Sequence, residues 1–315
     1  MIIHKDKDLS NFYLEDRIFH PHGINRFTIY WPKHNRDQLT PDEYLNKMYA
    51  AGINLLRMVV PGELERGVEP ELGKYDADFL KPVDHVFELA ADLGIQIILC
   101  LFDYAGFYAP WDDTVWQKSV YSTRFADVKD FFGSRELRKY QKARLAFLID
   151  HFKKYPNVFA WEIMNEMNYM GKFFDDQCEE VTMAWFDEMA EHLKSIDSQN
   201  LITGSLWGGE TWDSLYDHPL NDIVQVHTYD ETRDPGKIAA NIEMYVSAVK
   251  KHAKPVVIGE FASIEKNPRR AEFVENALTA AQAVNSSAWL YCSIWDEFGE
   301  MDDAMFEVYR RTKQV

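Results

Sequence analysis

The chain has 315 residues, of which 46% are hydrophobic, so it is long enough to bury a large core. Its 34 Lys and Arg residues stand against 51 Asp and Glu residues, which gives a formal net charge of -17. This charge repels polyphosphates over most of the surface, and it argues against nucleic acid and anionic membranes as partners.

From about Gly23 onward, short runs rich in β-branched and aromatic residues alternate with longer segments whose apolar residues recur at helical spacing. We predict strands at 24–30, 54–60, 95–102, 158–164, 201–206, 223–228, 256–261 and 288–295. The predicted helices that follow them are 41–51, 80–93, 134–154, 176–195, 211–217, 235–252, 268–284 and 302–312. Eight such alternations predict an α/β fold, with a parallel sheet closed into a single (β/α)8 TIM barrel.

Local signals agree with this pattern. Thr40-Pro41 can cap and begin a helix, and Gly52 and Gly94 stand where helices must end before a strand. Composition shows no linker, so residues 1–315 are predicted to form one domain. Residues 1–22 are predicted to be a short segment that closes the barrel bottom, and residues 103–133 a long loop after the third strand.

Three cysteines, Cys100, Cys178 and Cys292, match neither a disulfide framework nor a metal-ligand spacing, which favours a reducing compartment. The first six residues lack the apolar run of a signal peptide, and no stretch of about 18 apolar residues could span a bilayer. We therefore expect a cytoplasmic protein, or a secreted one if a signal was removed from the sequence.

The histidines near the N-terminus do not predict a metal site. His20-Pro21-His22, with His4 and His34 nearby, has no carboxylate or cysteine in a recognisable ligand pattern. His22 is expected to help structure the first strand instead. Neither GxxxxGK[ST] nor a strand-linked GxGxxG motif occurs, so we expect no metal and no nucleotide cofactor.

Two glutamates stand where a barrel carries chemistry. Glu166 ends the run of the fourth predicted strand, and Glu260 ends that of the seventh. The carboxyl ends of barrel strands meet at one face, so both side chains are expected at the barrel mouth. A pair of carboxyl groups there can divide proton donation and nucleophilic attack between them, whereas one strand-end carboxylate alone would be an ordinary loop residue.

These glutamates carry a family resemblance. Asn165-Glu166 after the fourth strand and Glu260 after the seventh resemble the signature of the clan A glycoside hydrolases, and the chain is similar to their family 5. The resemblance covers nearly the whole predicted barrel. Further matches follow strands two, six and eight: Arg57, His227, Tyr229 and Trp295. Residues 155–166, together with Tyr30-Trp31, are most similar to the β-mannanase branch.

The resemblance implies a retaining mechanism, with Glu166 as acid/base and Glu260 as nucleophile. Glu166 would need a raised pKa to be protonated near neutrality, and His227 is expected to tune or reprotonate it. Glu260 must stay ionised, which Arg57 and a hydroxyl of Tyr229 would favour. Each of these three supporting residues also has an ordinary structural reading, Arg57 as a salt-bridged barrel residue for example.

The remaining site residues bind substrate in this interpretation. Asn165 is expected to bind the 2-hydroxyl of the sugar under attack, and Trp295 to stack beneath that sugar. The 103–133 loop carries many aromatic rings, which could stack on sugars or pack the loop itself. Further stacking candidates, each with a structural alternative, are Trp31, Trp111, Trp207 and Trp212.

The substrate expected from the resemblance is a β-linked hexose oligosaccharide or polysaccharide. Many family 5 cellulases carry a His shortly after strand three, where this chain reads Leu101-Phe102-Asp103-Tyr104. This departure favours endo-acting hydrolysis of β-1,4-mannan or manno-oligosaccharides. The alternatives are an exo-acting β-mannosidase or β-glucosidase and, in another class, a non-catalytic carbohydrate-binding barrel. The sequence leaves the sugar, the endo or exo action and the oligomeric state open.

Overall fold

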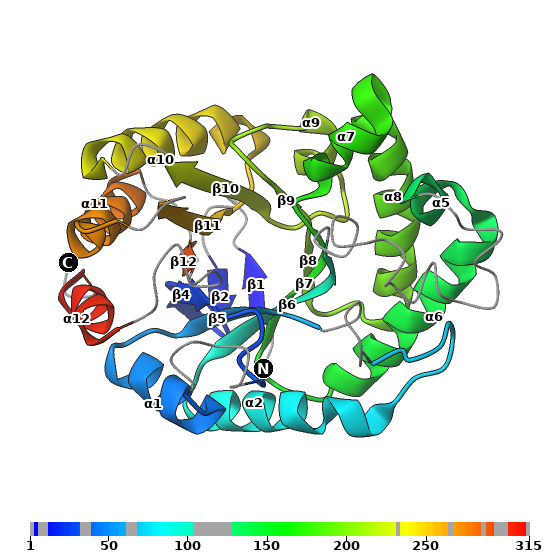
Figure 1. Ribbon diagram of the computed structural model, residues 1–315, viewed down its shortest axis with the longest axis horizontal. Helices are drawn as coiled ribbons and strands as arrows, with labels where there is room; N and C mark the ends of the chain where they lie inside the picture. The colour runs from blue at the N-terminus through cyan, green and yellow to red at the C-terminus, as the bar shows by residue number, and fades with distance from the viewer. Residues whose placement is uncertain are drawn as a thin grey trace.

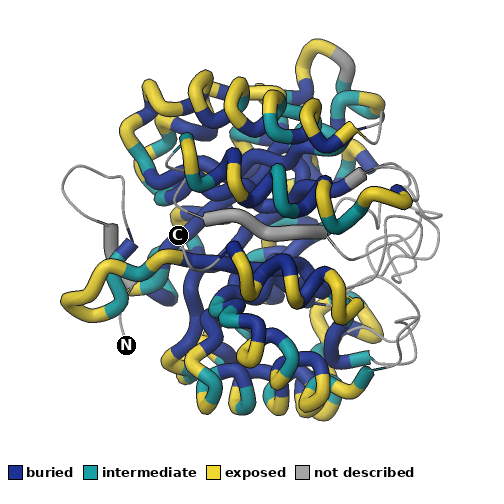
Figure 2. Tube along the Cα trace, turned by 90° about the vertical axis from the view of Figure 1, so that its left-hand side faces the viewer, coloured by how far each residue is buried: buried dark blue, intermediate teal, exposed yellow. Residues whose placement is uncertain are grey.

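The computed structural model describes residues 3–5, 12–31, 39–60, 68–103, 128–230, 234–263, 267–284, 288–292 and 302–312. Within them, a ring of strands lies at the centre and helices surround it (Figure 1). The helices bury their inner faces against the strands and expose their outer faces (Figure 2). None of the helices in these ranges is long and apolar enough to cross a membrane.

The central strands close into a barrel. They pair in the order β8-β7-β6-β5-β4-β12-β11-β10-β9, and every pairing among them is parallel. Only Gly204 separates β8 from β9, so these two segments are halves of one strand and join the ends of the sheet. The bounds are β4 His22–Asn25, β5 Leu55–Val59, β6 Gln96–Asp103, β7 Val158–Asn165, β8 Leu201–Thr203, β9 Ser205–Leu206, β10 Val224–Asp230, β11 Val256–Ser263 and β12 Ala288–Cys292.

The predicted helices lie where the sequence placed them, so the (β/α)8 prediction is confirmed. Their bounds are α1 Pro41–Ala50, α2 Lys81–Asp92, α6 Arg135–Phe152, α8 Cys178–Ile196, α9 Asp213–Tyr216, α10 Pro235–Val249, α11 Arg270–Ala283 and α12 Asp303–Thr312. The predicted start of α1 is also correct, because Thr40 and Glu43 form a reciprocal capping box ahead of Pro41. Gly52 and Gly94 end their helices with positive φ angles of 75° and 72°.

Several boundaries differ from the prediction. The strand predicted at 24–30 ends at Asn25, because residues 27–30 form turns closed by hydrogen bonds from Ile29 N to Arg26 O and from Trp31 N to Thr28 O. The strand predicted at 201–206 breaks at Gly204, where a Cβ would lie 2.8 Å from Met167 Sδ.

The loop predicted at 103–133 and the stretch before α8 also contain unpredicted structure. The loop begins with the last residue of β6 and ends in helix α5 Val128–Gly133, while residues 104–127 lie outside the described ranges. Short helical turns precede α8, namely η4 Met167–Met170, α7 Gly171–Phe174 and η5 Asp175–Gln177. These segments are too short for hydrophobic periodicity to reveal.

The described N-terminal residues lie at the end of the barrel at which its strands begin. Strands β1 Ile3–Lys5, β2 Phe12–Leu14 and β3 Arg17–Phe19 form a separate antiparallel sheet there (Figure 2). Phe12 is 1% exposed, and its ring meets that of Phe159 edge-on with centroids 4.8 Å apart. It completes an apolar cluster with Leu55, Ile98, Phe159, Ala160, Leu201, Ile223 and Val257.

Replacing Phe12 should destabilise the protein. We expect Phe12→Ala to lower the free energy of unfolding by about 3–5 kcal/mol, because it leaves a cavity beneath the barrel. Ile18→Ala on β3 is the control, since Ile18 is 53% exposed, and it should change stability by no more than about 0.5 kcal/mol. Urea denaturation of both variants measures the difference, and equal small losses would show that the N-terminal sheet does not seal the core.

Candidate active site

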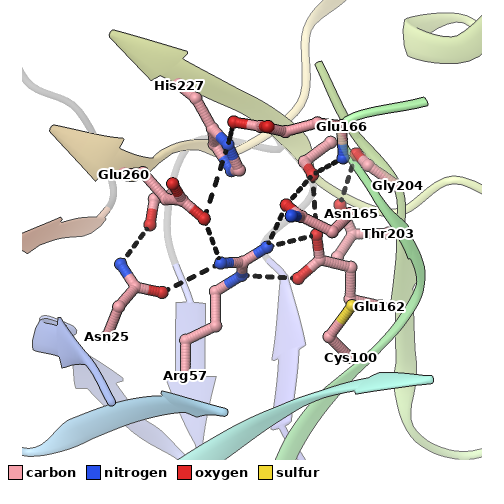
Figure 3. Close-up of polar contacts among 12 residues, drawn as sticks. Asn25, Arg57, Cys100, Glu162, Asn165, Glu166, Thr203, Gly204, His227 and Glu260 are labelled. Atoms are coloured by element: carbon pink, nitrogen blue, oxygen red, sulfur yellow. Dashed lines mark hydrogen bonds and ion pairs between the residues drawn. The ribbon is translucent and has the colours of Figure 1, made fainter. Parts of the chain in front are cut away.

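Charged and polar side chains gather inside the carboxyl-terminal half of the barrel, away from the N-terminal sheet (Figure 3). Arg57 lies on β5, Glu166 directly follows β7, His227 lies on β10 and Glu260 on β11. Each is at most 3% exposed. The structure therefore brings together two carboxylates and two basic side chains that the sequence placed at separate strand ends.

Arg57 is the centre of the hydrogen-bond network. Its Nε and Nη2 atoms donate to the two carboxylate oxygens of Glu162 at 2.6 and 2.7 Å. Its Nη1 atom donates to Glu260 Oε1 at 2.6 Å and to Asn25 Oδ1 at 2.9 Å, and Nη2 also donates to Asn165 Oδ1 at 2.9 Å. One guanidinium thus fixes side chains from β4, β7 and β11.

Glu260 is held at both carboxylate oxygens. Arg57 donates to Oε1, and the Tyr229 hydroxyl donates to Oε2. Burial raises the pKa of Glu260, while the Arg57 charge and the Tyr229 hydrogen bond act in the opposite direction. Arg57 and Tyr229 therefore offset part of the desolvation of a carboxylate that is 3% exposed.

A bulge at Gly259 sets the position of Glu260. Along the β10–β11 pairing, Val226 faces Ile258 but His227 faces Glu260, so Gly259 is the extra residue. A Cβ at position 259 would lie 2.7 Å from both Gln225 Cγ and His227 Nε2, so the strands could not approach as closely. The absence of a side chain at this position therefore allows Glu260 to lie beside His227.

His227 connects the two glutamates. Its Nδ1 atom lies 2.7 Å from Glu166 Oε1 and 3.7 Å from Glu260 Oε1. Burial holds the pKa of His227 well below its usual value, and the nearby charge of Arg57 acts in the same direction. The imidazole is therefore neutral at neutral pH, and it meets Glu166 with a hydrogen bond that carries no positive charge.

The two glutamates are close together. A carboxylate oxygen of Glu166, one of Glu260 and a ring nitrogen of His227 all lie within 4.8 Å of one another. This spacing would also suit a metal ion. However, Glu260 Oε1 already accepts a short hydrogen bond from the Arg57 cation, and Glu166 Oε1 is engaged by His227. Because both carboxylates are already bound by protein side chains, this geometry argues against a cation site.

The histidine predicted to be structural is placed as expected. His22 lies in β4, and its ring stacks on that of Tyr309 with centroids 4.6 Å apart. Tyr309 in turn donates from its hydroxyl to Gly23 O at 2.8 Å. His22 therefore joins the first barrel strand to the final helix α12.

Both the oxygen and the nitrogen of the Asn165 side-chain amide are hydrogen-bonded. Its Oδ1 accepts from Arg57, and its Nδ2 donates to Asp103 Oδ1 at 3.0 Å, because Asp103 and Asn165 pair between β6 and β7. Asp103 is the residue in the stretch where many family 5 cellulases carry a His. The carboxylate at this position therefore orients the residue next to Glu166.

The predicted stacking residues differ in their surroundings. Trp207 is half-buried with its ring 5.2 Å from that of Tyr169, and Asn168, two residues past Glu166, pairs with its backbone N and O atoms. Trp31 is half-buried against Phe79. Trp212 is only 7% exposed and belongs to the hydrophobic core, which agrees with its structural alternative. Two of the proposed stacking residues, Trp111 and Trp295, lie outside the described residues.

The sequence interpretation missed part of the network. Glu162, Ser205 and Asn25 are buried and bind the residues that it singled out. One signal for Glu162 was present, because Glu162 and Arg57 are lone charges inside otherwise apolar strands. Buried charges require partners, so the sequence alone could have suggested that Arg57 and Glu162 pair inside the barrel.

Comparison with known proteins gives matches that span most of the chain. Residues 19–298 match the family described as Cellulase (glycosyl hydrolase family 5). A rice (Oryza sativa subsp. japonica) mannan endo-1,4-beta-mannosidase 8 is 23% identical, over 93% of this chain and 92% of the relative. The match to this relative therefore spans nearly the full length of both chains.

Solved structures show the same fold. An endo-1,4-beta-mannanase from Rhizomucor miehei superposes with a TM-score of 0.78 at 18% identity, covering 100% of both chains. An exo-beta-1,4-mannosidase from Opitutaceae bacterium strain TAV5 gives a TM-score of 0.75 at 16% identity, covering 98% of this chain and 61% of that one. The chain therefore shares its barrel fold with these two proteins.

Removing the central cation should destabilise the protein in a pH-dependent way. We expect Arg57→Met to lower the free energy of unfolding by about 3–5 kcal/mol at pH 7, because Glu162 and Glu260 are left buried without their counter-charge. Burial raises the pKa of Glu260 in the folded state, so the folded form binds its proton more tightly than the unfolded form does. Stability is then lost as pH rises through the folded-state pKa, and the deficit should shrink at pH 5.

Urea denaturation at the two pH values checks this expectation. Arg269→Met is the control, because Arg269 pairs with Glu272 on the surface and its side chain is 59% exposed. It should change stability by less than about 0.5 kcal/mol at both pH values. A deficit of the Arg57 variant that is the same at pH 7 and pH 5 would contradict the account.

Proposed function

Because the chain belongs to glycosyl hydrolase family 5, and is therefore a glycosidase, we propose that it hydrolyses β-1,4-linked mannan or manno-oligosaccharides with retention of configuration. The observation that carries the proposal is the pair of buried carboxylates, Glu166 and Glu260, whose oxygens lie within 4.8 Å of each other beside His227. In this proposal Glu260 is the nucleophile and Glu166 is the acid/base.

The spacing of the pair supports retention. Retaining glycosidases hold their two carboxyl groups about 5–5.5 Å apart, whereas inverting enzymes need about 6.5–9.5 Å to admit a water molecule between carboxylate and sugar. One carboxylate oxygen of Glu166 lies within 4.8 Å of one of Glu260, which is compatible with the shorter of these separations. A nucleophile that contacts the sugar directly fits this arrangement.

The first step forms a covalent intermediate. Glu260, positioned by Arg57 and Tyr229, attacks the anomeric carbon while the glycosidic bond breaks. Glu166 transfers its proton to the departing oxygen. The neutral His227 beside Glu166 contributes a hydrogen bond without the positive charge that would oppose protonation of the carboxyl.

The second step releases the sugar. Glu166, now a carboxylate, takes a proton from water as the water oxygen attacks the anomeric carbon, and the bond to Glu260 breaks. Both enzyme groups return to their starting states, and the sugar keeps its β configuration. Asn165, fixed by Arg57 and Asp103, is proposed to bind the 2-hydroxyl during both steps.

The proposed sugar is mannose. Three relatives from rice and Arabidopsis thaliana carry the name mannan endo-1,4-beta-mannosidase, and the matches to two of them span 93% of this chain. In addition, Asp103 occupies the segment in which family 5 cellulases often place a His, and it binds the amide proposed to contact the 2-hydroxyl. Mannose and glucose differ at that hydroxyl, so this contact is where discrimination would arise.

Azide rescue tests the two roles. On 2,4-dinitrophenyl β-mannoside, we expect Glu260→Ala and Glu166→Ala each to lower kcat by at least about a thousandfold. Azide should then restore turnover with different products. It should give the α-mannosyl azide with Glu260→Ala, where azide replaces the nucleophile, and the β-mannosyl azide with Glu166→Ala, where it replaces the activated water.

A control variant accompanies this experiment. Glu188→Ala removes a surface carboxylate that pairs with Arg138 and Lys142, and it should retain wild-type kcat. The product configuration is read by proton NMR. Exchanged azide configurations would reverse the assigned roles, and undiminished turnover in both alanine variants would exclude the pair as the catalytic groups.

A substrate panel tests the sugar and the mode of cleavage. We expect kcat/KM for aryl β-mannosides to exceed that for aryl β-glucosides by at least about tenfold, since one contact to a hydroxyl group can discriminate to that extent. Mannohexaose should yield mannobiose and mannotriose before mannose. Faster hydrolysis of the glucosides would refute mannose specificity, and early release of mannose alone would indicate exo action.

A further inference from the structure

Glu162 is a buried carboxylate in the site that the proposed chemistry does not use. It lies in the middle of β7 and is 0% exposed. Its two oxygens accept from Arg57 at 2.6 and 2.7 Å, and Oε1 also accepts from Ser205 Oγ at 2.7 Å. A buried carboxylate is stable only when hydrogen bonds or counter-charges compensate its lost hydration, and these three hydrogen bonds do so for Glu162. Glu162 is therefore an integral part of the network.

One arm of the Glu162 network leads to Glu260. The guanidinium that binds both oxygens of Glu162 also binds Glu260 Oε1 through Nη1. The bidentate contact with Glu162 fixes the plane of the Arg57 fork, and this plane determines where Nη1 meets Glu260. The charge of Arg57 is also shared between two carboxylates, so Glu260 receives only part of it.

The other arm leads to Glu166. Ser205 donates its hydroxyl proton to Glu162 and accepts a hydrogen bond from the backbone N–H of Glu166 at 2.9 Å. Glu166 has φ 47° and ψ 60°, in the left-handed region that a residue with a Cβ rarely adopts. The hydroxyl thus holds the main chain of Glu166 in the conformation that turns its side chain toward His227.

We propose that Glu162 is a positioning residue that holds both catalytic glutamates, Glu260 through Arg57 and Glu166 through Ser205. The inference rests on the proposed function of those glutamates. It adds a role for a third carboxylate, which touches neither the sugar nor the reacting atoms. Its negative charge also keeps Arg57 from stabilising the Glu260 carboxylate so strongly that the nucleophile is weakened.

The charges around Glu260 give this proposal a measurable consequence. Arg57 faces Glu260 from β5, Glu162 and Glu166 from β7, and Tyr229 and His227 from β10. Of these, Glu162 is an anion whose charge raises the pKa of Glu260. Removing that charge should therefore lower the pKa of the nucleophile, an effect that a purely structural role would not produce.

Glu162→Gln is the variant that tests the Glu260 arm, because it removes the charge and keeps the shape. We expect the titration midpoint of Glu260 to move down by about one unit, and the acidic limb of the kcat/KM profile to move with it. We also expect kcat to fall about ten- to hundredfold with little change in KM. The midpoint is measured by NMR of protein labelled at the glutamate carboxyl carbon, with Glu260→Gln used to assign the resonance.

Glu69→Gln is the matched control. Glu69 is 2% exposed and pairs with Arg144 at 3.3 Å, so it is also a buried carboxylate bound to an arginine, but it lies outside the network. This variant should lose stability without moving the Glu260 midpoint. A midpoint that stays at its wild-type value in Glu162→Gln, or that moves equally in Glu69→Gln, overturns the Glu260 arm.

Ser205→Ala tests the Glu166 arm with a smaller change, and it serves even if Glu162→Gln does not fold. It should lower kcat about tenfold and leave the Glu260 midpoint near its wild-type value, because the charge of Glu162 is retained. Unchanged kcat in this variant overturns the Glu166 arm. A wild-type protein that hydrolyses no β-glycoside would defeat the proposed function, while the NMR midpoint would still decide the role of Glu162.

Discussion

The site depends on one buried cation. Arg57 is fully enclosed by the barrel, and its guanidinium is stable there because Glu162 and Glu260 compensate its charge. Since Arg57 and these two partners come from three different strands, β5, β7 and β11, the pairing also fixes how those strands approach one another at the site. The same contacts that make the burial of charge tolerable therefore give the candidate nucleophile its position.

The barrel supplies the second constraint. Parallel strands bring their carboxyl ends to one face, and small irregularities there aim individual side chains. The Gly259 bulge sets Glu260 opposite His227, and the left-handed backbone of Glu166 turns its carboxyl toward the same ring. Meanwhile Phe12 packs at the other end of the barrel against the apolar cluster that includes Leu55, Ile98 and Phe159.

The sequence predicted the architecture well because long periodic segments dominate it. Each predicted barrel helix and strand is present, and the paired glutamates meet as their strand-end positions implied. What it could not predict depends on contacts between distant residues. Ser205 has no local signature, Trp212 proved to be a core residue although its neighbours are polar, and the bulge at Gly259 follows from how β10 and β11 pair. Glu162 was detectable in principle, as a lone charge in an apolar strand.

Covalent trapping tests the central claim most directly. A 2-deoxy-2-fluoro-β-mannosyl fluoride should form a stable glycosyl-enzyme, because the fluorine at C2 slows both steps while the fluoride leaving group speeds only the first. The account predicts one added sugar per chain by intact-mass spectrometry, with the label on the peptide that contains Glu260. A label on Glu166 or Glu162, or no adduct from a protein that turns over β-mannosides, would contradict it.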